Sequence, residues 1–417
     1  MPQFFRVVEH TIPCSHSREY LAATRHGDAD RPKLAVKQYI PLSNPNPQPG
    51  DVTIIGAHAN GFPKELYEPL WDDLHQSLAK SGIRIRSVWI ADMWNQGQSG
   101  VLNEDILGDD PSWWDHTRDL INLLNLKRDE MPSPLVGVGH SMGGAQLTLL
   151  AISNPRLLHS LVLLDPVIQN IMSGIEPAAA STFRRDIWDS RSAAAAKFAA
   201  SRFYKAWDPR VLDLWIQHGL RDLPTALYPD LPAATESSSS NQPTPEPGPP
   251  VTLTTTKHQE VYNFLRPTYL PDRDQRDRLE SNKPEATRKY NFYRPEPVYA
   301  FDRLPELRPS VMYIFGATSE MSTPAARQAK LARTGTGLGG SGGVEKGMVK
   351  EVVVDCGHLV AMERAPECAE AAAGFLSGEL ARWREEQRIF GEASRAKNGK
   401  GVLVIDERWK GEVKPKI

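Results

Sequence analysis

The pentapeptide Gly139-His140-Ser141-Met142-Gly143 has the residue types and spacing of a serine nucleophile. It follows an apolar run, 135–138, and precedes a run with helix-compatible composition, 144–152. A serine at a sharp turn between a strand and a helix needs small neighbours, because larger side chains would collide with the adjacent backbone. Such a turn exposes the hydroxyl, so the motif predicts acyl transfer through Ser141.

A histidine suited to act as general base follows a later strand. Residues 349–354 are rich in valine, and after them come Gly357, His358 and a helical stretch over 364–383. His358 therefore lies on a loop at a strand end. Because imidazole titrates near neutral pH, His358 could take the proton of Ser141 and return it to the leaving group.

Two carboxylates could orient this histidine. Asp165 ends the first strand after the serine, 161–165, whereas Glu320 follows the later strand 311–315. In the commoner pattern the acid follows the later strand, but Ser319 stands about where that aspartate would be, and Glu320 comes one residue late. We expect Asp165 to be the acid and keep Glu320 as the alternative, since either could hold the imidazole tautomer.

A third strand end offers the donors of an oxyanion hole. The apolar segment 52–55 runs into the turn His58-Ala-Asn-Gly-Phe62. Negative charge develops on the former carbonyl oxygen during acyl transfer, and two backbone N–H groups commonly stabilise it. The expected donors are Met142, directly after the serine, and Asn60 in this turn.

Together these features resemble the α/β-hydrolase superfamily over residues 4–388. More narrowly, the chain resembles the fungal toxin-biosynthesis hydrolases of the AK-toxin type and the related yeast peroxisomal lipase. The resemblance is carried by 58–64 (HANGFPK), 91–99 (ADMWNQGQS), 164–167 (LDPV), 333–340 (RTGTGLGG) and the C-terminal tripeptide. It implies an α/β fold and places the acid after the earlier strand, which suits Asp165.

Strands alternating with helices predict a mostly parallel sheet covered on both faces, formed by residues 1–165 and 306–390. The alternation lapses over 166–305, where we expect an inserted helical lid with helices at 192–203 and 209–219, the second begun by Asp208 as N-cap. Inside the lid, the serine- and proline-rich segment 232–256 predicts disorder. Residues 391–417 are expected to form a tail.

Composition limits the classes of partner and cofactor. The 417 residues are 40% hydrophobic and carry a net charge of −2, which gives no indication of nucleic-acid binding. The three cysteines, Cys14, Cys356 and Cys368, form neither a disulfide framework nor a metal-ligand pattern. No metal, nucleotide or flavin cofactor is expected, and no apolar stretch is long enough to predict a membrane span.

The chain ends in Pro415-Lys416-Ile417, which is similar to the S-K-L signal read by the peroxisomal import receptor. We expect this receptor as a partner and the peroxisome as the location, with the cytoplasm as the alternative. The resemblance points to peroxisomes as well.

The sequence thus predicts a serine hydrolase that cleaves an ester or acyl thioester of a hydrophobic acid through an acyl-enzyme on Ser141, in toxin-type specialised metabolism. Two alternatives stay open. Carbon-carbon bond cleavage in a β-diketone-like compound uses the same three residue types, and the fold is also reused by non-catalytic scaffolds.

Overall fold

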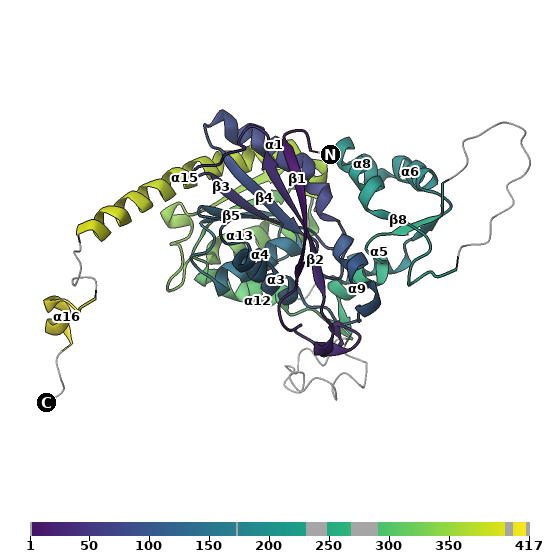
Figure 1. Cartoon of the computed structure of the whole chain (residues 1–417), viewed down its shortest axis with the longest axis horizontal. Coiled ribbons are helices and arrows are strands. Elements are labelled where there is room, and N and C mark those ends of the chain that lie inside the picture. The colour runs from purple at the N-terminus through teal and green to yellow at the C-terminus, as the bar shows by residue number, and fades with distance from the viewer. Residues whose placement is uncertain (1, 172–173, 231–247, 268–290, 397–402, 414–417) are drawn as a thin grey trace, which may run out of the picture.

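A computed structural model describes residues 2–171, 174–230, 248–267, 291–396 and 403–413 (Figure 1). Its centre is an eight-stranded sheet with strand order β1-β2-β4-β3-β5-β6-β12-β13. Strands β1 and β2 are antiparallel to their neighbours, and the strands from β4 to β13 pair in parallel. The strands are β1 (Phe5–Pro13), β2 (Lys33–Pro41), β3 (Val52–Ala57), β4 (Ile85–Ala91), β5 (Leu135–His140), β6 (Ser160–Leu164), β12 (Ser310–Gly316) and β13 (Val349–Val354).

Alternating side chains of the parallel strands feed two hydrophobic cores, one on each face of the sheet. In β6, Val162 and Leu164 pack into one core, and Leu161 and Leu163 into the other. Helices α1 (Glu68–Lys80) and α15 (Ala365–Ala396) cover the first face. Helices α3 (Trp113–Leu126), α4 (Met142–Ser153), α12 (Glu296–Arg303) and α13 (Pro324–Arg333) cover the second. The expected doubly covered α/β sheet is confirmed.

The insertion between β6 and β12 lies beside the sheet (Figure 1). Its elements before α12 are α5 (Ile175–Phe183), β7 (Ile187–Trp188), α6 (Arg191–Ala200), α7 (Arg202–Lys205), α8 (Pro209–His218), β8 (Leu220–Asp222), β9 (Val251–Leu253), α9 (Lys257–Phe264), β10 (Arg266–Pro267) and β11 (Phe292–Tyr293). The Asp208 side chain caps α8 by accepting from the N–H of Arg210, as expected. The helix expected over 192–203 is instead two helices, because the chain is extended at Ser201.

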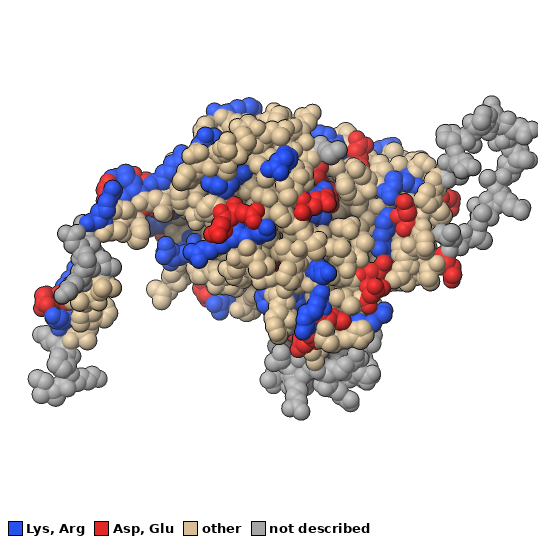
Figure 2. Space-filling view, in the orientation of Figure 1, with Lys and Arg blue, Asp and Glu red and all other residues tan. Residues whose placement is uncertain are grey.

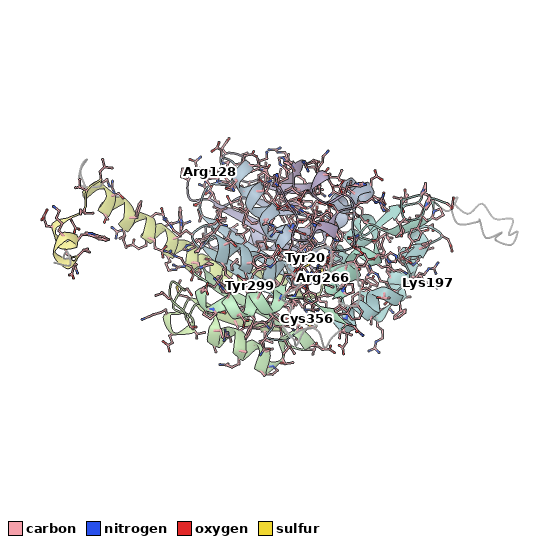
Figure 3. All side chains as sticks on the ribbon, turned by 90° about the horizontal axis from the view of Figure 1, so that it is seen from below. Tyr20, Arg128, Lys197, Arg266, Tyr299 and Cys356 are labelled. Atoms are coloured by element: carbon pink, nitrogen blue, oxygen red, sulfur yellow. The ribbon has the colours of Figure 1, made fainter. Side chains whose placement is uncertain are left out.

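A buried cation ties the insertion to the N-terminal part of the chain. The Arg266 guanidinium donates to Asp110 at 2.6 Å and lies 3.5 Å from the ring centroid of Tyr20 (Figure 3). Arg266 is 1% exposed. A paired and stacked guanidinium satisfies its charge inside the protein, so this contact fixes β10 against residues far away in the sequence.

Two sequence expectations are wrong in part. Most of the segment expected to be disordered, 232–256, lies outside the described residues, but Val251–Leu253 form the buried strand β9 between β7 and β8. A short apolar run was hidden by the surrounding proline-rich composition. The expected tail also begins later than residue 391, because α15 continues to Ala396, where ion pairs of Arg388 with Glu385 and Glu392 connect successive turns.

The remaining short elements are α2 (Gly97–Leu102), α14 (Val360–Glu363) and α16 (Glu407–Glu412). Residues 415–417, the expected import signal, lie outside the described residues. Basic and acidic side chains are mixed over the face seen in Figure 2, in keeping with the small net charge. Within the described ranges, every helix is too short or too polar to cross a bilayer.

Candidate active site

Ser141 occupies a strained turn between β5 and α4. Its backbone has φ 56° and ψ −117°, a region that side-chain-bearing residues rarely adopt. A Cβ at Gly139 would lie 2.7 Å from the Gly143 oxygen, and one at Gly143 would lie 2.2 Å from the Ala57 oxygen. Both glycines of the motif are therefore required by the close approach of backbone, as the sequence indicated.

His358 and Asp165 meet Ser141 at the carboxyl ends of the parallel strands. His358 Nε2 lies 2.8 Å from Ser141 Oγ, and His358 Nδ1 lies 2.6 Å from Asp165 Oδ2. Asp165 and Ser141 are 193 and 217 residues from His358 along the chain, yet the three side chains form one hydrogen-bonded series. The geometry is that of a nucleophile, a base and an orienting acid.

Asp165 is held as a buried anion. It is fully buried and has a positive φ of 39°. The N–H of Gly316 donates to Oδ1 at 3.1 Å, and the Ser319 hydroxyl donates to Oδ2 at 2.5 Å. Burial would raise the pKa of Asp165, but the hydrogen bond and charge of His358 together with the Ser319 hydroxyl lower it. The carboxylate therefore stays ionised beside the imidazole.

Glu320, the alternative acid, is exposed at the start of a short 3₁₀ turn, Glu320–Ser322. It borders the same cavity, but the Nδ1 hydrogen bond of His358 goes to Asp165. Ser319 stands where the commoner pattern has an aspartate, and its hydroxyl supports Asp165 instead. From the sequence, Ser319 is only the residue that stands in place of the commoner aspartate, and its hydroxyl at that strand end is the one signal of this role.

The two expected oxyanion donors border the cavity beside Ser141. Among the described residues, the N–H groups of Asn60 and Met142 have no protein acceptor. Gln96 holds the turn by accepting from the N–H of Gly61 at 2.8 Å and donating to Asn60 Oδ1 at 2.6 Å. The side-chain amide nitrogen of Asn60, Nδ2, donates to the backbone oxygen of Glu260 in α9. Both N–H groups are thus available to a developing negative charge.

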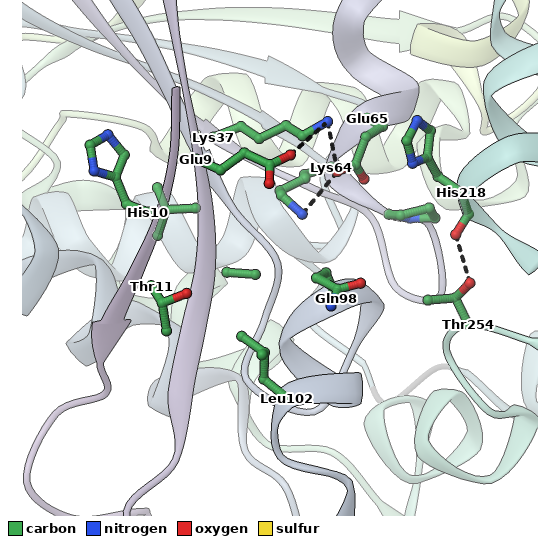
Figure 4. Close-up of a pocket in the computed structure, with 13 residues that line it drawn as sticks. Glu9, His10, Thr11, Lys37, Lys64, Glu65, Gln98, Leu102, His218 and Thr254 are labelled. Atoms are coloured by element: carbon green, nitrogen blue, oxygen red, sulfur yellow. Dashed lines mark hydrogen bonds and ion pairs between the residues drawn. The ribbon is translucent and has the colours of Figure 1, made fainter. Parts of the chain in front are cut away.

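A buried charge cluster follows this turn along the chain, and Figure 4 shows three of its members, Lys37, Lys64 and Glu65. Lys64 Nζ is 2.6 Å from Asp92 Oδ2 and 3.0 Å from Glu65, which also pairs with Lys37 at 3.2 Å. Burial disfavours the charged form of Lys64, but the Asp92 and Glu65 carboxylates outweigh it and raise its pKa. Asp92 also accepts from the N–H groups of Lys64 and Gln98. The cluster fixes the backbone that follows the oxyanion turn, and nothing in the sequence beyond isolated charged residues indicates it.

A cavity of about 710 Å³ opens onto Ser141 and His358. Apolar side chains from both the core and the insertion form much of its wall: Phe62, Val167, Phe203, Tyr204, Phe264 and Met321. One ion pair, Arg184 with Glu260, also borders it, and the Ser181 hydroxyl donates to the same carboxylate at 2.7 Å. A mostly apolar cavity with a few polar groups is typical of a site for a hydrophobic ligand.

The described residues contain no cluster of three or more His, Cys, Asp or Glu side chains able to hold a metal ion. The three cysteines are buried and free.

Two groups of fungal proteins are similar to this chain. A type I acyl-CoA thioesterase of Penicillium brevicompactum, mpaH', is 39% identical over 99% of this chain and 96% of its own length. The thioesterase mpaH of Penicillium roqueforti shows the same identity and coverage. The abhydrolase domain-containing protein AFT2-1 of Alternaria alternata is 28% identical over 59% of this chain and 84% of its own length.

A solved structure is similar in fold. The peroxisomal alpha-beta-hydrolase Lpx1 of Saccharomyces cerevisiae superposes with a TM-score of 0.66 at 16% identity, covering 97% of this chain and all of its own. A family model described as the alpha/beta hydrolase family matches residues 54–371. The expected fold, the fungal resemblance and the hydrolase class are confirmed. The chain belongs to the alpha/beta hydrolase family.

Proposed function

We propose that the protein hydrolyses the acyl-CoA thioester of a hydrophobic acid. The observation that carries this proposal is the series Ser141–His358–Asp165 opening into a large, mainly apolar cavity. Relatives that match nearly the whole chain are named acyl-CoA thioesterases, which supports a thioester over an oxygen ester. The resemblance to toxin-biosynthesis hydrolases of the AK-toxin type, which agrees with the Alternaria relatives, supports a role in specialised metabolism.

In the first half of the reaction, His358 Nε2 takes the Ser141 proton while Oγ attacks the thioester carbon. The N–H groups of Asn60 and Met142 stabilise the negative oxygen of the tetrahedral intermediate. The intermediate expels the thiolate of coenzyme A, which receives the proton from His358. Asp165 keeps the imidazole in the correct tautomer and stabilises the imidazolium.

In the second half, His358 takes a proton from water, and the resulting nucleophile attacks the acyl-enzyme ester. Collapse of the second tetrahedral intermediate releases the carboxylic acid and returns the proton to Ser141 Oγ. The nucleophile, the base and the two oxyanion donors all border the cavity, and Asp165 acts from behind His358. The insertion contributes Phe203 and Tyr204 to the wall, so we propose that it is a lid that selects the acyl group and excludes water.

The test is the rate of thiol release from a series of acyl-CoA thioesters, compared with the matched 4-nitrophenyl esters. Thioesters with long or aromatic acyl groups should be cleaved faster than acetyl-CoA, and Ser141→Ala should abolish the activity. A fluorophosphonate probe should label the wild type and not Ser141→Ala. Labelling that survives the substitution would show that another residue is the nucleophile.

The same three side chains could also cleave a carbon-carbon bond, so the geometry of the site fits both reactions. Product analysis with a β-diketone substrate tests this alternative. Turnover of the diketone without thioester hydrolysis would replace the proposed reaction. A protein that is correctly folded but inert to the probe and to every substrate would instead be a non-catalytic member of the family.

We also propose that the C-terminal Pro415-Lys416-Ile417 directs the protein to peroxisomes through the import receptor. Coenzyme A thioesters formed there would be its substrates. A fluorescent protein fused to the N-terminus should give punctate fluorescence that co-localises with a peroxisomal marker. Deletion of the last three residues should disperse it into the cytoplasm, and unchanged puncta would remove the proposal.

A further inference from the structure

A buried series of hydrogen bonds links the oxyanion turn to the loop that carries His358. The backbone N–H of Ala59 donates to Tyr67 Oη at 2.8 Å, and Tyr67 Oη lies 2.9 Å from His140 Nδ1. His140 Nε2 lies 3.1 Å from the backbone oxygen of His358. Tyr67 and His140 are at most 1% exposed, so the series is shielded from competing water.

The groups at the two ends fix the direction of every hydrogen bond. The Ala59 N–H can only donate, so Tyr67 Oη accepts from it and directs its own proton to His140 Nδ1. The backbone oxygen of His358 can only accept, so His140 Nε2 carries the proton. Burial lowers the pKa of His140 to about 3, which keeps the ring neutral and leaves a lone pair on Nδ1 for Tyr67.

A second buried histidine holds the carbonyl group of Ala59. The N–H of Met93 donates to His58 Nε2, so the proton of the ring lies on Nδ1, which donates to the Ala59 oxygen at 2.8 Å. Burial lowers the pKa of His58 and favours this neutral form. The Ala59 carbonyl and the Asn60 N–H belong to one planar peptide group and point in opposite directions. His58 therefore fixes the direction of an oxyanion donor.

We propose that Tyr67 and His140, assisted by His58, are positioning residues that hold the oxyanion turn and the His358 loop in a fixed position relative to each other. This inference rests on the proposed function of the site. The three side chains act through the backbone of Ala59 and His358, outside the set of side chains that border the cavity. They should therefore affect kcat much more than KM, because a misplacement of about 1 Å can slow a reaction about 100-fold.

The main test is Tyr67→Phe, which removes the hydroxyl and keeps the ring. Its matched control is Tyr313→Phe, since Tyr313 is equally buried and its hydroxyl bonds to Thr334 Oγ1 at 2.8 Å, within β12 and the α13 terminus. The readouts are the second-order rate of fluorophosphonate labelling and kcat for an acyl-CoA that the wild type cleaves, at a temperature where circular dichroism shows all variants folded. Tyr67→Phe should lower both rates about 10- to 100-fold with KM within about twofold, and Tyr313→Phe should leave them within about twofold.

Two substitutions of His140 separate positioning from simple packing. Glutamine places an amide nitrogen near the position of Nε2 and can still donate to His358. Asparagine reaches only as far as Nδ1, so it can accept from Tyr67 but loses the bond to the His358 loop. His140→Gln should therefore retain at least about five times the labelling rate of His140→Asn. Equal rates in the two variants, or a folded Tyr67→Phe that labels like the wild type, would overturn the proposal.

The tautomers give a readout that does not depend on catalysis. Spectra of ¹⁵N-histidine-labelled protein should contain a neutral Nε2–H ring that disappears in His140→Gln and a neutral Nδ1–H ring that disappears in His58→Asn. The opposite tautomer at His140 would exclude the hydrogen-bond series. If the wild type fails to react with the fluorophosphonate, the proposed nucleophile fails, while the tautomers still decide whether the two loops are joined as described.

Discussion

The sheet and the insertion differ in how firmly they hold the groups that face the cavity. Ser141 and Asp165 directly follow β5 and β6, parallel strands that are buried along their whole length, and His358 follows the parallel edge strand β13. The insertion is built from short helices and strands of two or three residues, and its aromatic Phe203 is 53% exposed. A firmly packed sheet is suited to hold the reacting groups in place, while the looser insertion is suited to select the acyl group.

The largest expected effect separates the two candidate acids within the rigid region. Asp165→Asn should lower kcat about 10⁴-fold, because the amide cannot stabilise the imidazolium and favours the wrong tautomer. Glu320→Gln should stay within about twofold of the wild type, since Glu320 is exposed and does not hold His358. Steady-state rates with one acyl-CoA decide this. A larger loss in Glu320→Gln than in Asp165→Asn would reverse the assignment.

The next prediction concerns the strained turn between β5 and α4 that carries Ser141. Gly143→Ala would place a methyl group 2.2 Å from the Ala57 oxygen, so β3 or α4 must shift. We expect a loss of about 3 kcal/mol or more in the free energy of unfolding, measured by urea denaturation. The matched control is Gly374→Ala in α15, where no atom outside the adjacent helix backbone lies within 4 Å of the new Cβ and helix propensity favours alanine by up to about 1 kcal/mol. Equal stability of the two variants would contradict a rigid turn.

A third prediction concerns acid sensitivity of the region around the sheet. Burial in α3 lowers the pKa of His116 to about 3, and both ring nitrogens lack a partner among the described residues. The folded pKa lies below the unfolded value of about 6.5, so the unfolded chain binds the proton first. The contribution of His116 to the free energy of unfolding is therefore fully present above about pH 6.5. Below that pH it decreases by up to about 1.4 kcal/mol per pH unit.

The variant His116→Phe removes this proton-linked loss and should flatten the dependence of the unfolding free energy on pH between about 6.5 and 4.5. Urea unfolding of the wild type and the variant at several pH values measures it. An unchanged slope would mean that the ring is already hydrated or partnered in solution.

The contrast between the sheet and the insertion also explains which features of the site and the fold could be predicted from the sequence. Ser141, His358 and the proposed donors Asn60 and Met142 could be singled out because strand-end motifs have fixed geometry. Asp165 and Glu320 both follow strands, so the sequence alone favoured Asp165 but left Glu320 open, and the family resemblance strengthened the choice of Asp165. Ser319, Gln96 and the Tyr67–His140 series were not foreseen, because side-chain hydrogen bonds between distant segments leave no periodic pattern. In the insertion, β9 was missed because three residues are too short for an alternation to register.

The smallest expected effect tests the looser region. Phe203 lies on α7 and borders the cavity, so Phe203→Ala should remove apolar contact with the acyl group. Because Phe203 is partly exposed already, the loss should be about 1 kcal/mol, which is about a fivefold rise in KM for a long-chain acyl-CoA with little change in kcat. Phe183→Ala is the control, since Phe183 is 87% exposed at the end of α5 and does not border the cavity. If Phe203→Ala changes kcat as strongly as KM, the insertion takes part in aligning the reacting groups, and the division between a rigid catalytic region and a selective insertion would fail.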